Sequence, residues 1–146
     1  MKAVYIAKHG SSDVLTYGEF PEPEFGPNEV LIRVRACALN RLDLYIRAGA
    51  RGTRRNFDKP HILGSDVAGD VIEIGDDVTS VRRGTRVVVN PKLTCRQCRL
   101  CLAGQDDLCD QFPGMLGSTS NGGYAEYVVA PASNVLPLPD NVTYEN

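Results

Sequence analysis

Short runs of apolar residues recur along the chain, and each run is bounded by glycine, proline or charged positions. The runs are rich in β-branched and aromatic side chains, which pack well on the pleated surface of a sheet. Turn residues at 75–77 and 83–84 mark reversals between successive runs. The pattern predicts a mostly β fold with strands at residues 2–7, 30–39, 67–74, 85–90, 124–130 and 134–136.

One segment has helical periodicity. Residues 41–48 place Leu42, Tyr45 and Ile46 three or four positions apart, as on one face of a helix. Asn40 is a preferred residue type for an N-cap, and Gly49 is a typical helix stop. We therefore expect a single short helix of about two turns.

Two segments depart from these patterns. Residues 21–27 carry three prolines, which fix φ and remove N–H donors, so we expect an extended connector there. Residues 49–59 hold Arg51, Arg54 and Arg55 among glycine and threonine, which predicts an exposed, mobile loop. These arginines could meet an anionic group of a cofactor or substrate, but a solvated loop is the favoured interpretation.

Composition and charge narrow the functional classes. The 146 residues are enough for one ordinary domain, and 16 Lys and Arg against 18 Asp and Glu give a net charge of -2. A chain with this balance offers no general surface for nucleic acid. It also lacks an apolar run near the roughly 20 residues of a membrane span, and Lys8 interrupts the only apolar run near the N-terminus. We expect a cytoplasmic protein that binds neither nucleic acid nor membrane.

Four of the five cysteines are closely spaced. Cys95, Cys98, Cys101 and Cys109 form the pattern C-x2-C-x2-C-x7-C within residues 91–117, a segment with almost no strand periodicity. Four thiolates complete a tetrahedral shell and leave no open position, which predicts a structural zinc that holds the lobe together. Two disulfides, free thiols, iron and an iron-sulfur cluster remain as alternatives. Cys37 lies apart, on an apolar strand, and is interpreted as a buried, inert thiol.

Several further motifs occur in a fixed order along the chain. They are PNEVLIRV at 27–34, GSDVAG at 64–69, Gly75, GTRV at 84–87 and GGYAEY at 122–127. Together with the cysteine spacing, they make the whole chain resemble the N-terminal, GroES-like catalytic domain of the zinc-containing medium-chain alcohol dehydrogenase and quinone reductase superfamily. The resemblance implies a partly open, GroES-like β-barrel with one short helix and a four-cysteine zinc lobe.

The departures from that family bear on function. In its alcohol dehydrogenases a catalytic zinc is held by a Cys just before the helix, by the His of a Gly-His-Glu motif and by a third ligand. Aligned on Asp43, these first two positions are Asn40 and Ser65 here, and an amide and a hydroxyl are weak zinc ligands. Cys37 lies three residues too early to substitute. His61 could substitute, but a polar loop residue is the favoured interpretation.

Residues 40–49 instead resemble the N-x-x-D-x-Y-I-R-x-G pattern of the zinc-free quinone reductases. The resemblance implies that Asn40 and Tyr45 line the nicotinamide and substrate cleft, that Asn40 contacts the cofactor, and that Asp43 belongs to the same catalytic site. A structural interpretation stands beside it, because Asn40 and Asp43 also fit a helix N-cap with a first-turn carboxylate.

No strand followed by G-x-G-x-x-G and a helix occurs in the chain, so the nicotinamide has no binding domain here. We expect residues 1–146 to form one GroES-like domain, a fragment that is inactive alone and is followed by a Rossmann domain. The first hypothesis is an NAD(P)H-dependent quinone or enone reductase with a structural zinc only, acting on a small molecule as a homo-oligomer. The alternatives are a zinc-dependent alcohol dehydrogenase and a stand-alone, non-catalytic zinc-stapled binding module.

Overall fold

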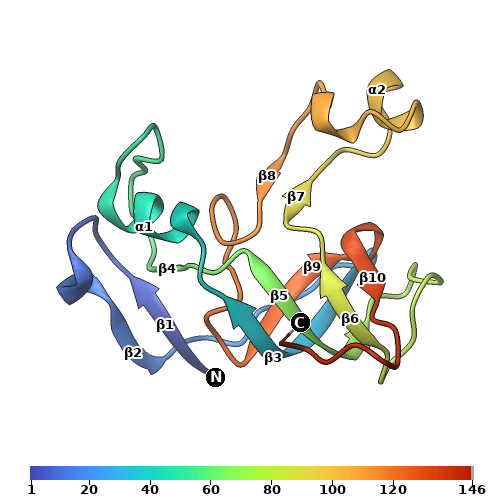
Figure 1. Cartoon of the computed structure of the whole chain (residues 1–146), viewed down its shortest axis with the longest axis horizontal. Helices are drawn as coiled ribbons and strands as arrows, with labels where there is room; N and C mark the ends of the chain where they lie inside the picture. The colour runs from blue at the N-terminus through green and yellow to red at the C-terminus, as the bar shows by residue number, and fades with distance from the viewer. Residues whose placement is uncertain (146) are drawn as a thin grey trace.

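Five antiparallel strands form the central sheet of the computed structural model, which describes residues 1–145 (Figure 1). Their order across the sheet is β10-β6-β5-β3-β9. The longest pair, β3 and β5, lies at the centre, and its register shifts between Leu31 and Ile32 and between Val34 and Ala36, which marks β-bulges. The strand bounds are β3 Glu29–Ala38, β5 Asp66–Ile74, β6 Arg86–Val89, β9 Tyr127–Pro131 and β10 Val135–Pro137.

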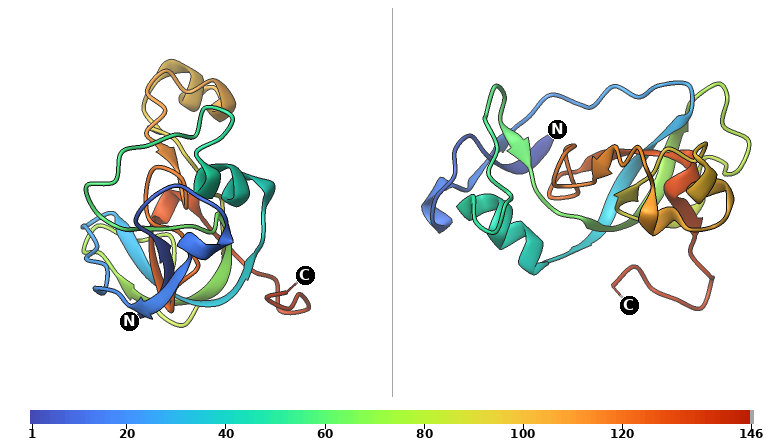
Figure 2. Two further views of the ribbon diagram at one scale, coloured as in Figure 1. Left: turned by 90° about the vertical axis from the view of Figure 1, so that its left-hand side faces the viewer. Right: turned by 90° about the horizontal axis from the view of Figure 1, so that it is seen from above.

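A smaller sheet closes one side of the structure. It has the order β2-β1-β4, with bounds β1 Lys2–Ile6, β2 Thr16–Glu19 and β4 His61–Ile62. The segment before β9 connects it to the central sheet, because the Tyr124 carbonyl accepts from the Val4 N–H at 2.7 Å and the Glu126 carbonyl accepts from the Val34 N–H at 2.9 Å. The two sheets therefore curl into a half-barrel, which the turned views of Figure 2 show. The expected partly open barrel is confirmed.

The main core lies inside this curl. Alternate residues of β3 and β9 point inward, as the period of two along a strand requires. Its buried members are Val30, Ile32, Val67, Val71, Val78, Val81, Val87, Val89, Leu116, Val128, Ala130 and Val135. A second, smaller cluster of Ile6, Ile46 and Leu63 packs α1 against β1.

Helix α1 spans Arg41–Ala48, as the periodicity predicted. The Asn40 side chain accepts from the Leu42 N–H at 3.1 Å, and the Asp43 carboxylate accepts from the Asn40 N–H at 2.8 Å, which completes a capping box. Gly49 ends the helix at a φ of 67° in the left-handed region, where glycine is favoured. The predicted helix and both of its caps are confirmed.

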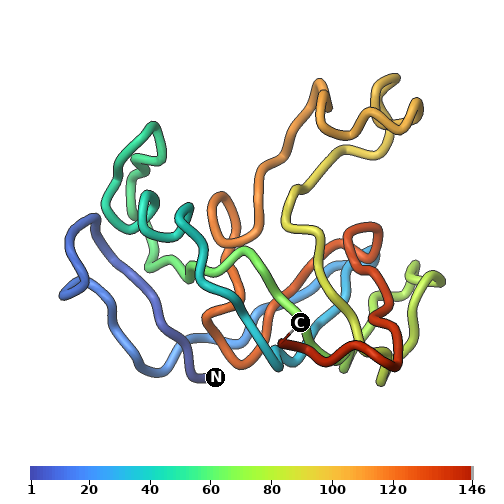
Figure 3. The backbone as a smooth tube through the Cα atoms, viewed as in Figure 1, coloured from blue at the N-terminus to red at the C-terminus, as the bar shows by residue number. Residues whose placement is uncertain are grey.

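The four-cysteine lobe projects from the half-barrel (Figure 1). Figure 3 follows the chain out along β7 (Lys92–Leu93), around the lobe and back along its antiparallel partner β8 (Gly114–Met115). The lobe contains the one-turn helix α2 (Arg99–Leu102), which the sequence did not predict and which buries none of its residues. Arg96 ties the lobe to the barrel, because its guanidinium donates to Asp106 at 2.8 Å and to the Ser133 carbonyl at 3.2 Å.

The structure corrects the predicted starts of two strands. Strand β9 begins at Tyr127 instead of residue 124, because the preceding residues bond to β1 and β3 instead. Asn134 lies in a 3₁₀ turn, where its side-chain amide donates to the carbonyls of Asn90 at 2.9 Å and Lys92 at 2.8 Å, so β10 begins at Val135.

The arginine-rich segment 49–59 is held to the rest of the structure through Arg55. The His9 Nδ1–H donates to the Ile46 carbonyl at 2.8 Å, while its Nε2 accepts from the Arg55 N–H at 3.0 Å. The Arg55 guanidinium is half-buried and donates to the Ser118 carbonyl at 2.9 Å. The expectation of a solvated loop is therefore wrong for Arg55, although Arg51 and Arg54 are exposed. No helix within residues 1–145 has the length and apolar character needed to cross a bilayer.

Candidate functional site

The four predicted metal ligands converge in the lobe. The sulfur atoms of Cys95, Cys98, Cys101 and Cys109 all lie within 4.8 Å of one another, and those of Cys95 and Cys101 are 3.9 Å apart. Sulfurs bound tetrahedrally at the Zn–S distance of about 2.3 Å are separated by about 3.8 Å. All five cysteines of the chain are free of disulfides. The four-sulfur set could therefore hold a tetrahedral zinc ion.

Backbone N–H groups around the cluster prepare it for a cation. The Cys98 N–H donates to the Cys95 sulfur at 3.3 Å, and the Cys101 N–H donates to the Cys98 sulfur at 3.4 Å. Donation from the N–H groups of Cys101 and Asp110 lowers the pKa of Cys98 to about 6. Burial acts in the opposite direction at Cys101 and raises its pKa to about 12, so a bound dication is needed to hold all four groups as thiolates.

A second group of polar side chains lies at the N-terminus of α1, around Asp43. This carboxylate is 4% exposed and accepts three hydrogen bonds. Its donors are the Asn40 N–H at 2.8 Å, the Gly64 N–H at 3.0 Å and the Tyr124 hydroxyl at 2.8 Å. Burial and the bond to Asp43 raise the pKa of Tyr124, which keeps its hydroxyl a donor. Asp43 thus joins three chain segments, and its oxygens face protein groups.

Asn40 and Asp66 form a pair beside this carboxylate. The Asn40 Nδ2 donates to the Asp66 carboxylate at 3.1 Å, while its Oδ1 accepts from the Leu42 N–H at 3.1 Å. Asn40 is exposed and Asp66 is half-buried, so the pair lies at the surface, where a bound molecule can reach it. The sequence analysis treated Asp66 only as part of a motif, because nothing local connects it to a residue 26 positions earlier.

Gly64 allows the close packing behind this pair. Its φ is +96°, and a Cβ there would lie 2.8 Å from the Cys37 sulfur and 2.6 Å from a ring carbon of Tyr124. Burial and the charges of Asp43 and Asp66 raise the pKa of Cys37 to about 12, so it remains a neutral thiol. The raised pKa agrees with the interpretation of Cys37 as inert, but the residue is half-buried and not fully buried as expected.

The positions aligned with catalytic zinc ligands do not form a comparable metal site. Ser65 is 2% exposed, and its hydroxyl has no partner among the described residues. The Asn40 amide is held by Asp66 and Leu42. Within residues 1–145, the four cysteines are the one group of three or more His, Cys, Asp or Glu side chains whose ligand atoms converge. The donor set at Asn40 thus does not fit a zinc held by thiolate and imidazole.

Tyr45 stands apart from Asn40 and Asp43. It follows Asp43 by two residues and therefore points about 200° away around the helix. Its ring is half-buried beneath the Arg51 guanidinium, which lies 4.9 Å from the ring centroid. The structure thus brings together Asn40 and Asp43 but not Tyr45.

His61 lies in β4 and is 2% exposed, so its interpretation as a polar loop residue is wrong. Pairing with Ile6 of β1 draws it inside, and its Nε2 donates to the Gly117 carbonyl at 3.0 Å. Burial lowers the pKa of His61 from 6.5 to about 4, against the opposing effect of that bond. His61 is therefore a neutral interior residue.

Stability should fall on acidification because of His61. The unfolded chain takes up a proton near pH 6.5 and the folded chain only near pH 4, so the free energy of unfolding decreases as the pH falls between these values, by at most about 3 kcal/mol. Urea unfolding at several pH values is expected to show a shallower loss for His61→Gln than for the unchanged protein. Equal slopes of unfolding free energy against pH in the two proteins would contradict this assignment. Release of metal by acid affects both proteins alike, so it does not alter the comparison.

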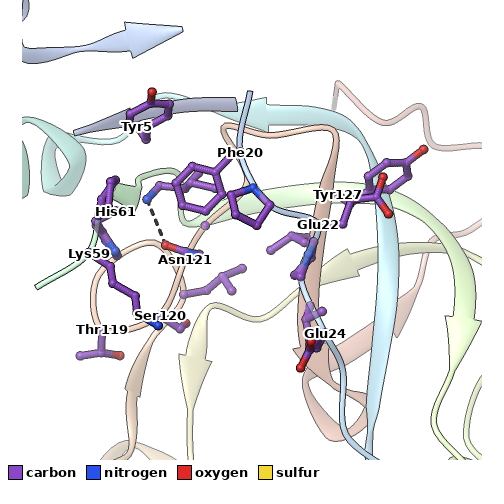
Figure 4. Close-up of a pocket in the computed structure, with 18 of the residues that line it drawn as sticks. Tyr5, Phe20, Glu22, Glu24, Lys59, His61, Thr119, Ser120, Asn121 and Tyr127 are labelled. Atoms are coloured by element: carbon purple, nitrogen blue, oxygen red, sulfur yellow. Dashed lines mark hydrogen bonds between the residues drawn. The ribbon is translucent and has the colours of Figure 1, made fainter. Parts of the chain in front are cut away.

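One pocket lies away from the Asn40 and Asp43 cluster. It has a volume of about 940 Å³ and is lined by residues of the proline-rich connector, the 55–62 segment and the 119–122 turn. Figure 4 shows Lys59, Thr119 and Ser120 on one side of it and Glu22 and Glu24 on another. A second pocket of about 630 Å³ has Cys37, Leu39 and Tyr124 in its wall.

A family model and a curated relative both match most of this chain. The family model described as "Alcohol dehydrogenase GroES-like domain" matches residues 26–140. An L-threonine 3-dehydrogenase from Francisella tularensis subsp. novicida (strain U112) is 41% identical over 123 residues, which cover 84% of this chain and 35% of that protein. The chain thus spans about a third of the length of the curated relatives it matches.

Solved structures agree over almost the whole chain. The crystal structure of an NAD-dependent alcohol dehydrogenase matches with a TM-score of 0.90 and 42% identity, covering 99% of this chain and 41% of that one. A thermostable alcohol dehydrogenase from Pyrobaculum aerophilum, bound to cobalt and zinc, has a TM-score of 0.89 and 40% identity, covering 99% of this chain and 42% of that one. Similarity therefore extends through both the half-barrel and the cysteine lobe.

Proposed function

Because this chain belongs to the family of alcohol dehydrogenase GroES-like domains, we propose that it is the substrate-binding part of an NAD(P)-dependent oxidoreductase. Within that class, we propose a reductase of quinones or of α,β-unsaturated carbonyl compounds with a structural zinc in the cysteine lobe. The nicotinamide domain would be contributed by sequence outside residues 1–146, since the relatives are more than twice as long as this chain. The cofactor supplies the hydride.

One observation carries the choice of substrate class. At the position where the resemblance to zinc-dependent alcohol dehydrogenases implies a zinc ligand, the chain places an amide that is bonded to a carboxylate and a backbone N–H. An amide can hydrogen-bond to a carbonyl oxygen, but it cannot lower the pKa of an alcohol as zinc does. Quinones and enones are already electrophilic and accept hydride without a Lewis acid. The site therefore suits reduction of such a carbonyl compound.

The chemistry expected of this chain is limited to binding and orientation. A bound NAD(P)H would supply the hydride and leave as NAD(P)⁺, and one proton from solvent would complete the reduction. Asn40 would donate a hydrogen bond to the substrate oxygen and contact the nicotinamide, whereas Tyr45, which lies beneath Arg51 on another side of α1, is not assigned to this cleft. Asp43 would support Asn40, because its carboxylate is occupied by three protein donors.

The proposal includes a location and an assembly state. Four thiols that serve as metal ligands must remain reduced, which suits the cytoplasm. The intact protein would act on small molecules as a homo-oligomer, with no nucleic acid or membrane partner.

A zinc-dependent alcohol dehydrogenase is the second candidate. The observation in its favour is similarity, because the two alcohol dehydrogenase structures are 42% and 40% identical to this chain. It would require a second zinc ion with ligands other than the aligned Asn40 and Ser65. Assays of the full-length protein with quinones, enones and primary or secondary alcohols, each with NADH or NADPH and the oxidised forms, separate the two functions.

Asn40→Ser is the sharpest variant for this test. Serine remains a good N-cap, so α1 should persist, but its side chain is too short to bond Asp66 and the substrate together. We expect kcat/KM for the best quinone or enone to fall about a hundredfold while the unfolding free energy changes little, because a donor to a developing oxyanion is lost. Full activity of this variant would refute the assignment of Asn40.

A further inference from the structure

Two neighbouring groups fix the orientation of the Asn40 side-chain amide. The Leu42 N–H can only donate, and the Asp66 carboxylate can only accept. Both bonds are made when Oδ1 faces Leu42 and Nδ2 faces Asp66, at 3.1 Å each. A flipped amide would lose both bonds and place its oxygen against the carboxylate. Asp66 and Leu42 therefore specify the same orientation.

The remaining capacity of the amide follows from this arrangement. Nδ2 carries two hydrogens, and only one is used by Asp66. Asn40 is exposed, so the second N–H is available to a bound molecule. The Asp66 backbone is fixed at the start of β5, where it pairs with Ala38 at the end of β3. Both members of the pair thus stand on ordered backbone.

We propose that Asp66 is a positioning residue that locks the Asn40 amide so that it presents an N–H donor to the substrate, which selects an oxygen that accepts a hydrogen bond. This inference rests on the proposed function for its substrate. It adds the direction of the hydrogen bond, which runs from Asn40 to the substrate. The site therefore takes a carbonyl or quinone oxygen in preference to a hydroxyl group that must donate its own hydrogen. Asp66 itself does not touch the substrate.

The charge of Asp66 is separable from its role as an acceptor. A carboxylate beside a substrate oxygen that gains negative charge opposes that charge, whereas its hydrogen bond to Nδ2 only requires an oxygen lone pair. Asp66→Asn retains such an oxygen and removes the charge. Asp66→Ala removes both. Comparison of the two variants therefore isolates orientation from electrostatics.

Kinetics of the full-length protein with its best quinone or enone provide the first test. Asp66→Ala is expected to lower kcat about tenfold, and Asp66→Asn is expected to restore it to within about twofold of the unchanged protein or above. Asp76→Asn, at an exposed turn, is the matched control and should have no effect. Equal losses in Asp66→Ala and Asp66→Asn would overturn the positioning role.

Exchange of the two side chains gives a second test, which separates the unfolding free energy from kcat. In the double variant Asn40→Asp with Asp66→Asn, the carboxylate at 40 can cap the helix and accept from the amide at 66, so the unfolding free energy should return to that of the unchanged protein. The free N–H now belongs to residue 66, so kcat should remain as low as in Asn40→Asp. Recovery of both quantities would contradict the proposal.

The side-chain amide signals of Asn40 test the orientation without turnover. In ¹H–¹⁵N spectra, these signals are identified by their absence in Asn40→Asp. One of the two Nδ2 protons is expected to shift on Asp66→Ala and to shift much less on Asp66→Asn. If Asp66→Ala leaves both protons unchanged, the positioning inference fails. If the spectra behave as expected but no quinone or enone is reduced, the proposed function fails instead.

Discussion

Replacement of Cys98 by serine is expected to release the metal ion from the lobe and to loosen residues 91–117. Three thiolates leave the tetrahedral shell incomplete, and the lobe has little else to hold it, since α2 buries none of its residues. Structural zinc sites bind with about 10 kcal/mol or more, so loss of one ligand from a site that organises its own loop has a large effect. Zinc content should fall from about one ion per chain to close to zero.

Limited proteolysis reports the accompanying change in structure. Cleavage of the Cys98→Ser variant should concentrate within residues 91–117, whereas the half-barrel, which has its own core, should remain resistant. Cys37→Ser is the matched control because Cys37 lies outside the lobe, and it should retain the metal. Retained zinc and unchanged resistance in the Cys98→Ser variant would contradict a structural metal site.

Asp43→Ala is expected to destabilise the fold by about 4 kcal/mol, because it removes a buried carboxylate and leaves three donors without an acceptor. The loss spans three segments: the start of α1, the turn before β5 and the segment before β9. Unfolding in urea measures it, with zinc present throughout.

Tyr124→Phe is the control for this prediction. It removes one of the three donors and leaves the other two bonds in place, so the expected loss is about 1 kcal/mol. A loss below about 1 kcal/mol for Asp43→Ala would show that the carboxylate does not join these segments.

The features that were predictable from the sequence are those encoded by neighbouring residues. Helix α1 has its bounds fixed by the Asn40 cap, the Asp43 carboxylate and the left-handed Gly49, all within ten positions. The four-cysteine cluster is likewise local, since its ligands span 95–109. The central strands follow from their β-branched runs, which bury alternate residues.

The features that were missed depend on residues far apart in the chain. Strand β4 has only two residues and forms because Tyr5 and Ile6 pair with it. The Tyr124 bond to Asp43 joins residues 81 positions apart, and the Asn40 bond to Asp66 joins residues 26 positions apart. His61 is buried by the same pairing. No local periodicity carries this information, so the supports of the site emerge only in three dimensions.

The sequence supported two interpretations of residues 40–43, a helix cap and a catalytic site, and the structure is compatible with both. Asp43 has its oxygens occupied by protein donors, which fits a structural role. Asn40 caps the helix through Oδ1 and still holds one N–H toward solvent. Capping and the proposed substrate contact therefore use different atoms of the same side chain.

Metal content of the full-length protein tests the central claim most directly. That claim is one zinc ion in the cysteine lobe and none at the Asn40 position. Elemental analysis of protein purified without chelators should give one zinc per chain, and the Cys98→Ser variant should remove it. Two tightly bound zinc ions per chain, with one retained in Cys98→Ser, would contradict the account and favour a zinc-dependent alcohol dehydrogenase.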